Sequence, residues 1–310
     1  MITASVSIGV VITSFNYRNF IAEAVDSALE QSHPALEVVV VDDGSTDGTV
    51  QYLRERYAAE PRLKLIATEN CGQLAAFVTG ARASRGEVVA FLDADDIWEN
   101  DYLSRIAAVY ARQPKVDFVY TNMRFFGTRE GLLLPDTRSR ELGLSILLGA
   151  YDSRWQASAT SAISLRRALA LKVLDVPAQM QGQWPTQADV CVARGADILG
   201  AHKFYLGDAL VRYRAHGNNA WLDQRSDDAA ALKHGLRMQS MLSFYRDQAG
   251  LQPAGKRENL RYVKYEFRGK RPARYEDLKR YLRLLDQSRM PWTKRIETKL
   301  SMWKHYFRHR

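Results

Sequence analysis

The sequence has few cysteines and no long apolar run. Cys71 and Cys191 are the two cysteines among 310 residues, too few for a disulfide scaffold or a four-thiolate zinc site, and typical of a reducing compartment. No apolar run approaches the roughly 18–20 residues that span a bilayer, and residues 1–7 lack the basic and apolar regions of a signal peptide. The 46% hydrophobic content excludes disorder. We therefore expect a soluble cytoplasmic protein with a sizeable core.

Acidic residues are scarce in one part of the chain only. Residues 256–310 carry 18 Lys and Arg against 6 Asp and Glu, a net charge of +12, whereas the remaining residues have a net charge of −3. The overall charge of +9 therefore belongs to the C-terminal tail. Such asymmetry indicates an acidic partner surface, either nucleic acid or anionic lipid.

The first 120 residues alternate strand and helix patterns. β-Branched runs of buried-strand length alternate with segments whose apolar residues recur at helical spacing. The pattern predicts strands at 6–13, 37–41, 63–67, 88–92 and 117–121, and helices at 18–31, 46–57, 73–83 and 100–113. This order predicts an α/β fold with a mostly parallel, Rossmann-like sheet and helices on both faces. Ligands of such sheets bind outside the carboxyl ends of the strands.

The second half of the chain is less regular. Residues 124–153 contain several glycines and Pro135, a composition that predicts a loop or flap. Helices are predicted at 158–174 and 189–199, a strand at 206–214, and helices from residue 220 to the end.

Carboxylates gather where two predicted strands end. Asp93, Asp95 and Asp96 follow one buried strand, and Asp42 and Asp43 follow another. Carboxylates this close raise one another's pKa unless a cation neutralises them. A hard divalent ion with oxygen ligands is the usual neutraliser, and it commonly leaves positions open for substrate phosphates. The alternative is a solvated turn in which one aspartate caps the next helix, but two acidic strand ends together favour a nucleotide and metal crevice.

Four ordered motifs within residues 6–100 resemble the family 2 glycosyltransferases. They are residues 12–17 (ITSFNY), 42–49 (DDGSTDGT), 70–73 (NCGQ) and 91–96 (FLDADD). The resemblance, to members of the bacterial polysaccharide or glycan type, implies a GT-A fold, a nucleotide-diphosphate sugar donor, and Mg or Mn. It also implies a catalytic domain at 1–219, with a nucleotide-sugar-binding half at 1–121 and an acceptor half at 122–219. Residues 220–310 are then a basic helical C-terminal extension.

The resemblance assigns roles to individual residues. The donor-nucleotide residues that it implies are Thr13, Phe15, Asn16, Tyr17, Asp43, Asn70, Gln73 and Asp93. In this assignment Asp43 recognises the base, Asp93 holds the ribose, and Asp95 holds the metal, with Asp96 replacing or assisting it. His216, in the segment 211–219 that resembles the closing motif of the family, approaches the metal or the diphosphate. Residues 158–167 resemble an acceptor-side helix.

A general base is expected at the start of a later helix. Asp189 matches best, although alanine precedes it where many members have a second acid, and its alternative role is a helix N-cap. Asp197 and Asp175 are the other candidates. A carboxylate that takes the proton of the acceptor hydroxyl in a single displacement inverts the anomeric centre. The metal, with Arg212, Arg214 or His216, would stabilise the leaving nucleoside diphosphate.

Three other classes of protein share part of this pattern. A sugar nucleotidyltransferase or a dinucleotide-dependent dehydrogenase should carry a glycine-rich loop after the first strand, and residues 13–18 contain no glycine. A nucleic-acid-binding protein would explain the basic tail but not the acidic strand ends, so nucleic acid is not an expected partner. Asp43 could pair with uracil or thymine, and UDP is chosen over dTDP because it is the commoner donor. The acceptor is expected to be a glycan or a lipid-linked saccharide.

The last twenty residues have the pattern of an interfacial helix. Trp292, Ile296, Leu300, Trp303 and Phe307 recur at helical spacing among lysines and arginines. Tryptophan beside an apolar stripe with basic flanks is typical of helices that lie on anionic membranes. This predicts peripheral attachment to the inner face of the cytoplasmic membrane. The alternative is that the stripe packs on the catalytic domain or on a second subunit of a homo-oligomer.

Overall fold

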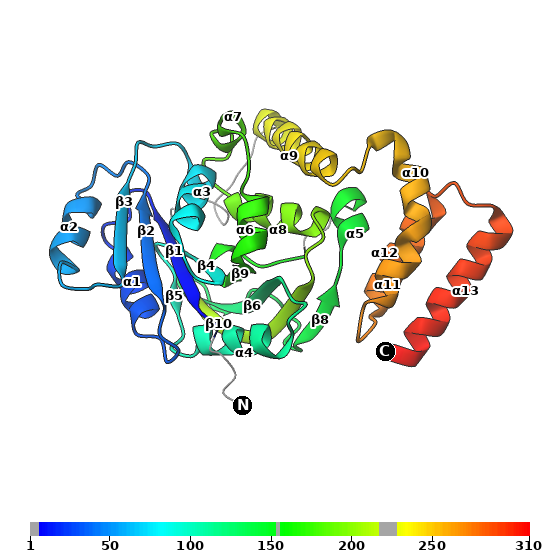
Figure 1. Cartoon of the computed structure of the whole chain (residues 1–310), viewed down its shortest axis with the longest axis horizontal. Coiled ribbons are helices and arrows are strands. Elements are labelled where there is room, and N and C mark those ends of the chain that lie inside the picture. The colour runs from blue at the N-terminus through cyan, green and yellow to red at the C-terminus, as the bar shows by residue number, and fades with distance from the viewer. Residues whose placement is uncertain (1–5, 153–155, 217–227) are drawn as a thin grey trace.

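The sheet is that of an α/β fold. A computed structural model describes residues 6–152, 156–216 and 228–310. Its strands are β1 Ile8–Ser14, β2 Glu37–Asp42, β3 Leu63–Ala67, β4 Val88–Asp93, β5 Ile97–Trp98, β6 Phe118–Gly127, β7 Gly131–Leu132, β8 Arg140–Gly143, β9 Ile163–Arg166 and β10 Lys203–Ala215. They form a sheet in the order β3-β2-β1-β4-β9-β6-β10-β5, with β7 on β6 and β8 on β10 (Figure 1). The first four strands in this order are parallel neighbours, as are β6 and β10, so the predicted fold is confirmed.

Helices cover both faces of the sheet. Before the C-terminal region they are α1 Ile21–Leu29, α2 Thr49–Arg56, α3 Gln73–Ala83, α4 Tyr102–Arg112, α5 Ile146–Tyr151, α6 Arg167–Val173, α7 Ala178–Gln181, α8 Ala188–Ile198 and α9 Asp228–Gln248. Side chains of α1, α2 and α4 pack with Val10 on one face, and those of α3, α6 and α8 pack with Val11 on the other. Successive strand residues point to opposite faces, so the uninterrupted apolar run of β1 supplies both clusters.

The prediction of a helix at 158–174 is wrong for the first half of this segment. Residues Thr160–Ala162 form one 3₁₀ turn, β9 follows, and only α6 is helical. β9 is antiparallel to both β4 and β6 and is inserted between them. Ile163, Ser164 and Leu165 are fully buried because a central strand is covered on both faces. The alternation that marks a strand is therefore missing from the sequence.

The predicted loop at 124–153 is also partly structured. β6 continues to Gly127, β7 folds back on it, and β8 and α5 follow. β10 begins at Lys203, earlier than predicted, and pairs with β8, β6 and β5. The sheet thus extends well beyond the nucleotide-binding half predicted from sequence.

The predicted helical C-terminal region is present. We call α10 Lys256–Asn259, α11 Val263–Arg268, α12 Tyr275–Asp286 and α13 Trp292–His309 the C-terminal unit. In Figure 1 it lies beside α5 and β8, with α13 outermost. α9 packs differently, because its Met241 and Tyr245 are buried in the cluster that contains α8. No helix among the described residues is long and apolar enough to cross a bilayer.

The C-terminal unit is joined to the rest of the chain through α5. Leu147 and Leu148 of α5 share a cluster with residues of α11, α12 and α13. The carboxylate of Glu266 accepts hydrogen bonds from the backbone N–H groups of Leu147 (2.8 Å) and Leu148 (3.3 Å), which satisfies the N-terminus of α5. Arg280 forms a 2.9 Å ion pair with Asp152 just after α5. Polar and apolar contacts therefore fix the two parts together.

The apolar stripe of α13 faces away from the described part of the chain. Trp292 is 68% exposed and Leu300 is 64% exposed, and Ile296 and Phe307 are also exposed. α13 instead buries Thr298 and Met302 on its inner face, and Trp303 is only partly buried. The alternative that the stripe packs on the catalytic domain is therefore wrong for its four exposed residues.

Candidate functional site

Four parallel strands bring their carboxyl ends to one edge of the sheet. Thr13 lies opposite Asp93 in the pairing of β1 with β4, and Ser14 lies opposite Asp42 in the pairing of β1 with β2. The polar segments that follow these strands therefore meet, which the sequence pattern indicated.

The loops after β1 and β2 hold each other. The backbone N–H of Asn16 donates to Ser45 Oγ at 2.7 Å, and Thr46 N–H donates to Asn16 Oδ1 at 2.8 Å. Asn16 adopts a positive φ of 60°, which asparagine tolerates better than most residues. Ser45 is held in turn by Asp42, to which its hydroxyl donates at 2.7 Å. Phe15 and Asn16 are both exposed.

Asp43 fastens the segment after β3. Its two carboxylate oxygens accept the backbone N–H groups of Cys71 and Gly72, each at 2.8 Å. Gly44 has a φ of +83°, and a Cβ there would lie 2.8 Å from the backbone nitrogen of Asn70, so the two segments touch. Burial raises the pKa of Asp43, although both backbone hydrogen bonds oppose the increase. The carboxylate therefore holds the segment after β3 beside the end of β2, a contact that the sequence did not indicate.

Gln73, which follows this segment, links the end of β4 to the start of α8. Its amide Nε2 donates to Asp93 Oδ1 at 3.0 Å, and its Oε1 accepts the N–H of Ala188 at 3.1 Å. One side chain therefore spaces the end of β4 from the helix that carries Asp189.

The three carboxylates after β4 have different surroundings. Asp96 is 1% exposed, and it accepts hydrogen bonds from the Ser161 hydroxyl at 2.6 Å and from the Arg214 backbone N–H at 2.9 Å. Asp95 Oδ2 lies 2.9 Å from His216 Nε2, and Tyr17 also bonds to this carboxylate. Asp96 thus faces the protein interior, whereas Asp95 lies among residues of the predicted site.

Burial and mutual repulsion perturb this cluster. Burial, followed by the charges of Asp95 and Asp189, raises the pKa of Asp93 well above its usual value. Burial, followed by the charges of Asp95 and Asp93, does the same for Asp96. Burial and the neighbouring carboxylates also raise the pKa of Tyr17. Such concentrated negative potential is where a cation binds favourably. No three His, Cys, Asp or Glu side chains in the described residues are arranged to hold a metal ion.

Ser161 is a site residue that the sequence did not indicate. Besides holding Asp96, its hydroxyl accepts the backbone N–H of Asp93 at 3.0 Å, and its carbonyl accepts the indole N–H of Trp98 at 2.7 Å. It lies in the 3₁₀ turn before β9, within the segment predicted as an acceptor-side helix. Nothing in a run of serine, alanine and threonine distinguishes this serine from its neighbours.

His216 is held by aromatic contacts. Its ring stacks on Phe20 with centroids 5.2 Å apart and lies 6.3 Å from that of Tyr17. Arg214 donates through Nε to the Asp95 carbonyl at 2.8 Å and pairs with Glu23 at 3.0 Å. Residues 217–219 of the predicted closing motif lie outside the described residues.

Asp189 lies in the first turn of α8, near enough to the carboxylate cluster for its charge to act on Asp93. The helix is capped by Gln187, which adopts a positive φ of 64°, so Asp189 is not the N-cap. Burial raises the pKa of Asp189 to about 6, and its charge in turn contributes to the raised pKa of Asp93. A carboxylate with a pKa near the working pH is suited to general-base chemistry.

The two alternative bases lie in other settings. Asp197, near the other end of α8, is buried and forms a 2.9 Å ion pair with Lys203. Asp175 is 80% exposed in its side chain and lies 3.9 Å from Arg82. Neither Asp197 nor Asp175 is among the residues whose charges raise the pKa of Asp93 or Asp96.

Comparison with known proteins identifies the family. Residues 9–171 match the model for glycosyl transferase family 2. An uncharacterized glycosyltransferase of Nostoc sp. is 33% identical over 237 residues, 74% of this chain and 72% of the relative. The chondroitin synthase of Escherichia coli is 36% identical over 42% of this chain, but only over 19% of its own length.

Solved structures show the same fold. The chain resembles S. aureus TarS residues 1–349 in complex with UDP, with a TM-score of 0.56, 19% identity, and coverage of 97% of this chain and 91% of that one. The family match covers most of the sheet and the acidic edge described above. The chain therefore belongs to glycosyl transferase family 2 and is a glycosyltransferase of GT-A fold.

Proposed function

We propose that the protein transfers a sugar with inversion from a UDP-sugar to a hydroxyl of a glycan or lipid-linked saccharide, assisted by Mg²⁺ or Mn²⁺. The observation that carries this proposal is Asp189, whose pKa is raised to about 6 and whose charge acts on Asp93 at the end of β4. A single inverting displacement needs one base, which activates the acceptor hydroxyl on the face of the anomeric carbon opposite the leaving nucleoside diphosphate.

The donor nucleotide occupies the crevice at the carboxyl edge of the sheet. Residues 13–17 line one side, and Asp43 with residues 70–73 line the other. Because both oxygens of Asp43 already accept backbone N–H groups, base recognition uses their remaining lone pairs and the backbone that Asp43 orients. UDP is supported by its presence in the similar S. aureus TarS structure.

Asp95 is the proposed main metal ligand, with Asp93 toward the ribose. Asp96 is the less suited of the two, because it is buried and each of its oxygens already accepts a hydrogen bond, from Ser161 or from Arg214. Ions such as Mg²⁺ commonly bind one or two carboxylates together with substrate phosphates and waters. That coordination fits a site in which Asp95 and His216 are the protein's contribution. When bound, the ion neutralises charge that develops on the diphosphate.

The chain's own residues then perform two tasks. Asp189 accepts the proton of the acceptor hydroxyl as the hydroxyl oxygen attacks the anomeric carbon. The bond between that carbon and the diphosphate oxygen breaks in the same step, which releases the nucleoside diphosphate. Gln73 keeps the base and Asp93 at a set separation, because it bonds to both Asp93 and the first turn of α8. Family membership favours this transferase chemistry over the nucleotidyltransferase and nucleic-acid-binding alternatives.

A screen of nucleotide sugars tests class and donor together. We expect hydrolysis of one UDP-sugar that requires Mn²⁺ or Mg²⁺, stops with EDTA and returns when the metal is restored. Release of free UDP from UDP-glucose, UDP-N-acetylglucosamine and UDP-glucuronate is measured beside the dTDP and GDP counterparts. Metal-independent turnover, or preference for a GDP-sugar, would contradict the donor and metal assignments.

We also propose that α13 attaches the enzyme to an anionic membrane. Four apolar side chains of its stripe are exposed, and the C-terminal residues carry a net charge of +12. Lysines and arginines near an anionic surface contribute about 1 kcal/mol each, so several together hold an otherwise water-exposed enzyme there. This position suits an acceptor that is itself lipid-linked.

Vesicle flotation tests the attachment. Full-length protein should float with vesicles of phosphatidylcholine and phosphatidylglycerol but not with phosphatidylcholine alone. Leu300→Glu should weaken vesicle binding about 10–100-fold. The substitution removes an apolar side chain that would be buried in the membrane, and it places a negative charge beside the anionic lipid. Leu232→Glu on α9, where the leucine is 63% exposed against 64% for Leu300, is the matched control and should float normally. A dimer that Leu300→Glu dissociates, without vesicle binding, would assign the stripe to a second subunit instead.

A further inference from the structure

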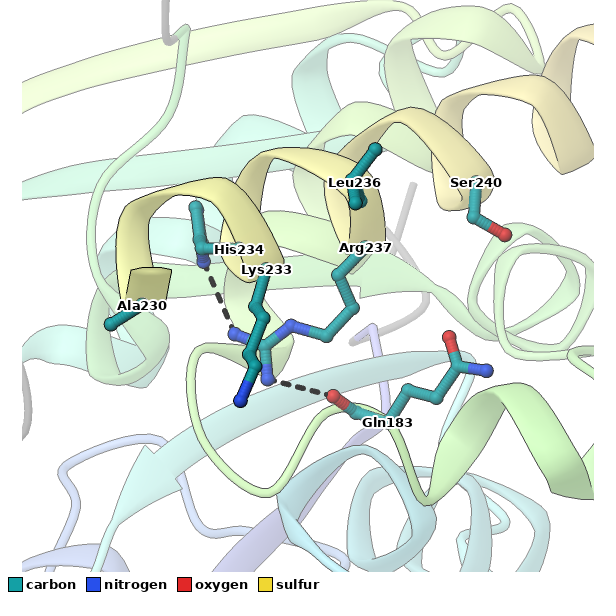
Figure 2. A pocket seen from close by; sticks show the side chains of 7 residues that line it. All are labelled: Gln183, Ala230, Lys233, His234, Leu236, Arg237 and Ser240. Atoms are coloured by element: carbon teal, nitrogen blue, oxygen red, sulfur yellow. Dashed lines mark hydrogen bonds between the residues drawn. The ribbon is translucent and has the colours of Figure 1, made fainter. Parts of the chain in front are cut away.

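A pocket of about 570 Å³ lies on α9, outside the donor crevice. Its described lining consists of Gln183, Ala230, Lys233, His234, Leu236, Arg237 and Ser240 (Figure 2). Its volume is within the range of sites that bind small molecules. Figure 2 shows Lys233 and Arg237 extending from the helix toward the loop that carries Gln183.

The loop that forms one wall of this pocket leads directly to the proposed base. Arg237 donates to the Gln183 carbonyl at 2.9 Å, and its guanidinium lies 4.9 Å from the centroid of the Trp184 ring. The carbonyl of Pro185, further along the loop, accepts the N–H of Gln73 at 3.2 Å. Gln183 precedes Asp189 by six residues, so their Cα atoms are at most about 22 Å apart. The wall of the pocket therefore lies within the reach of an oligosaccharide whose reacting hydroxyl is at Asp189.

The charge of the pocket is positive. Lys233 and Arg237 are its cations, and its described lining contains no carboxylate. Neither cation forms an ion pair with a carboxylate of the described residues, and the buried Nε of Arg237 has no hydrogen-bond partner there. His234 accepts a hydrogen bond from Arg237 at Nδ1 (3.2 Å), which leaves its proton on Nε2 as a further donor.

The remaining lining suits a carbohydrate. Leu236 offers an exposed apolar side chain, and Gln183 and Ser240 offer an amide and a hydroxyl. The first half of α9 is free to provide this surface because its second half anchors the helix. Tyr245 packs against Gly195 of α8, where a Cβ would lie 2.5 Å from its ring, and donates to the Val173 carbonyl at 3.0 Å.

We propose that this pocket binds an anionic group, a carboxylate or a phosphate, on the part of the acceptor glycan that extends from the reacting hydroxyl. The proposal rests on the proposed function, since it assigns the acceptor to the side of Asp189 away from the donor. Lys233 and Arg237 supply the charge, His234, Gln183 and Ser240 supply hydrogen-bond donors, and Leu236 contacts the sugar ring.

Direct binding to the full-length protein tests this pocket without any transfer step. The probes are oligogalacturonate, its methyl ester, and an oligomer of glycerol phosphate, each measured by calorimetry at low and at physiological salt. We expect at least one anionic probe to bind and the neutral ester to bind about 10-fold more weakly or not at all. The two anionic probes distinguish a carboxylate from a phosphate ligand.

Charge reversal locates the binding. Lys233→Glu replaces an attraction with a repulsion and should weaken binding of the anionic probe about 10-fold. Lys172→Glu, an exposed lysine on α6, is the matched control, and Lys294→Glu tests the basic tail. Both controls should bind the probe as the wild type does, and Lys172→Glu should also hydrolyse the donor normally.

Three results would overturn the proposal. They are equal binding of the acid and its ester, no change in Lys233→Glu, and an equal loss in Lys294→Glu, which would move the binding to the tail. Failure of the proposed function would appear separately, as absent donor hydrolysis in the wild type.

Discussion

Asp189→Asn should lower the rate of sugar transfer by about 10²–10⁴-fold, the usual contribution of a general base, with UDP affinity almost unchanged. Asparagine preserves the shape of the side chain in the first turn of α8 but cannot accept the acceptor's proton. A transfer assay beside calorimetry of UDP binding measures both quantities. Asp175→Asn, at an exposed carboxylate outside the cluster, is the matched control and should retain full activity.

The pH profile gives this prediction a second readout. Because burial raises the pKa of Asp189 to about 6, the base is protonated and inactive at lower pH. The rate constant of wild-type transfer should therefore rise about tenfold per pH unit below 6 and level off above it. The residual activity of Asp189→Asn should lack this inflection. Wild-type turnover in the variant would move the base to another carboxylate.

Asp95→Ala should lower metal-dependent transfer by on the order of 10³-fold or more, since the lost ligand contributes several kcal/mol of transition-state stabilisation. The melting temperature of the metal-free protein should hold or rise slightly. The reason is that the charge of Asp95 raises the pKa of both Asp93 and Asp96, and its removal relieves that repulsion. Thermal unfolding with and without Mn²⁺, beside the transfer assay, measures both effects.

Asp96→Ala distinguishes a ligand from a structural carboxylate. This variant leaves the Ser161 hydroxyl and the Arg214 N–H without their acceptor in a buried place, which costs about 1–3 kcal/mol of stability. We therefore expect a lower melting temperature for Asp96→Ala and not for Asp95→Ala. Full activity of Asp95→Ala, or its unfolding, would contradict the assignment of Asp95 as the ligand.

The parallel half of the sheet could be predicted from sequence because its signals are local. Apolar runs that contain valine mark β1, β2 and β4, and each ends at a turn rich in aspartate, asparagine or glycine. Parallel strands that end together bring those turns to one edge. The meeting of the acidic turns at one edge thus followed from strand order, whereas the roles of individual residues came from the family resemblance.

What escaped prediction depends on contacts between distant parts of the chain. β9 pairs on both edges with strands far away in sequence, and its small and apolar residues read equally well as helix. The hydrogen bonds that Ser161 and Asp43 make to other segments of the chain are likewise seen only in the folded structure. The apolar stripe of α13 was recognisable from the sequence. Periodicity shows which residues share a helix face, but it does not show whether that face is buried or exposed.

The central position of β9 has a consequence for synthesis on the ribosome. β4 pairs with β1 as soon as it emerges, but its other edge has no partner until Ile163–Arg166 leaves the exit tunnel. Over that interval a strongly apolar strand presents unpaired backbone groups, the kind of edge that templates aggregation. A nascent chain arrested before residue 160 should therefore bind chaperones, and fragments that end near residue 121 should be poor candidates for separate expression.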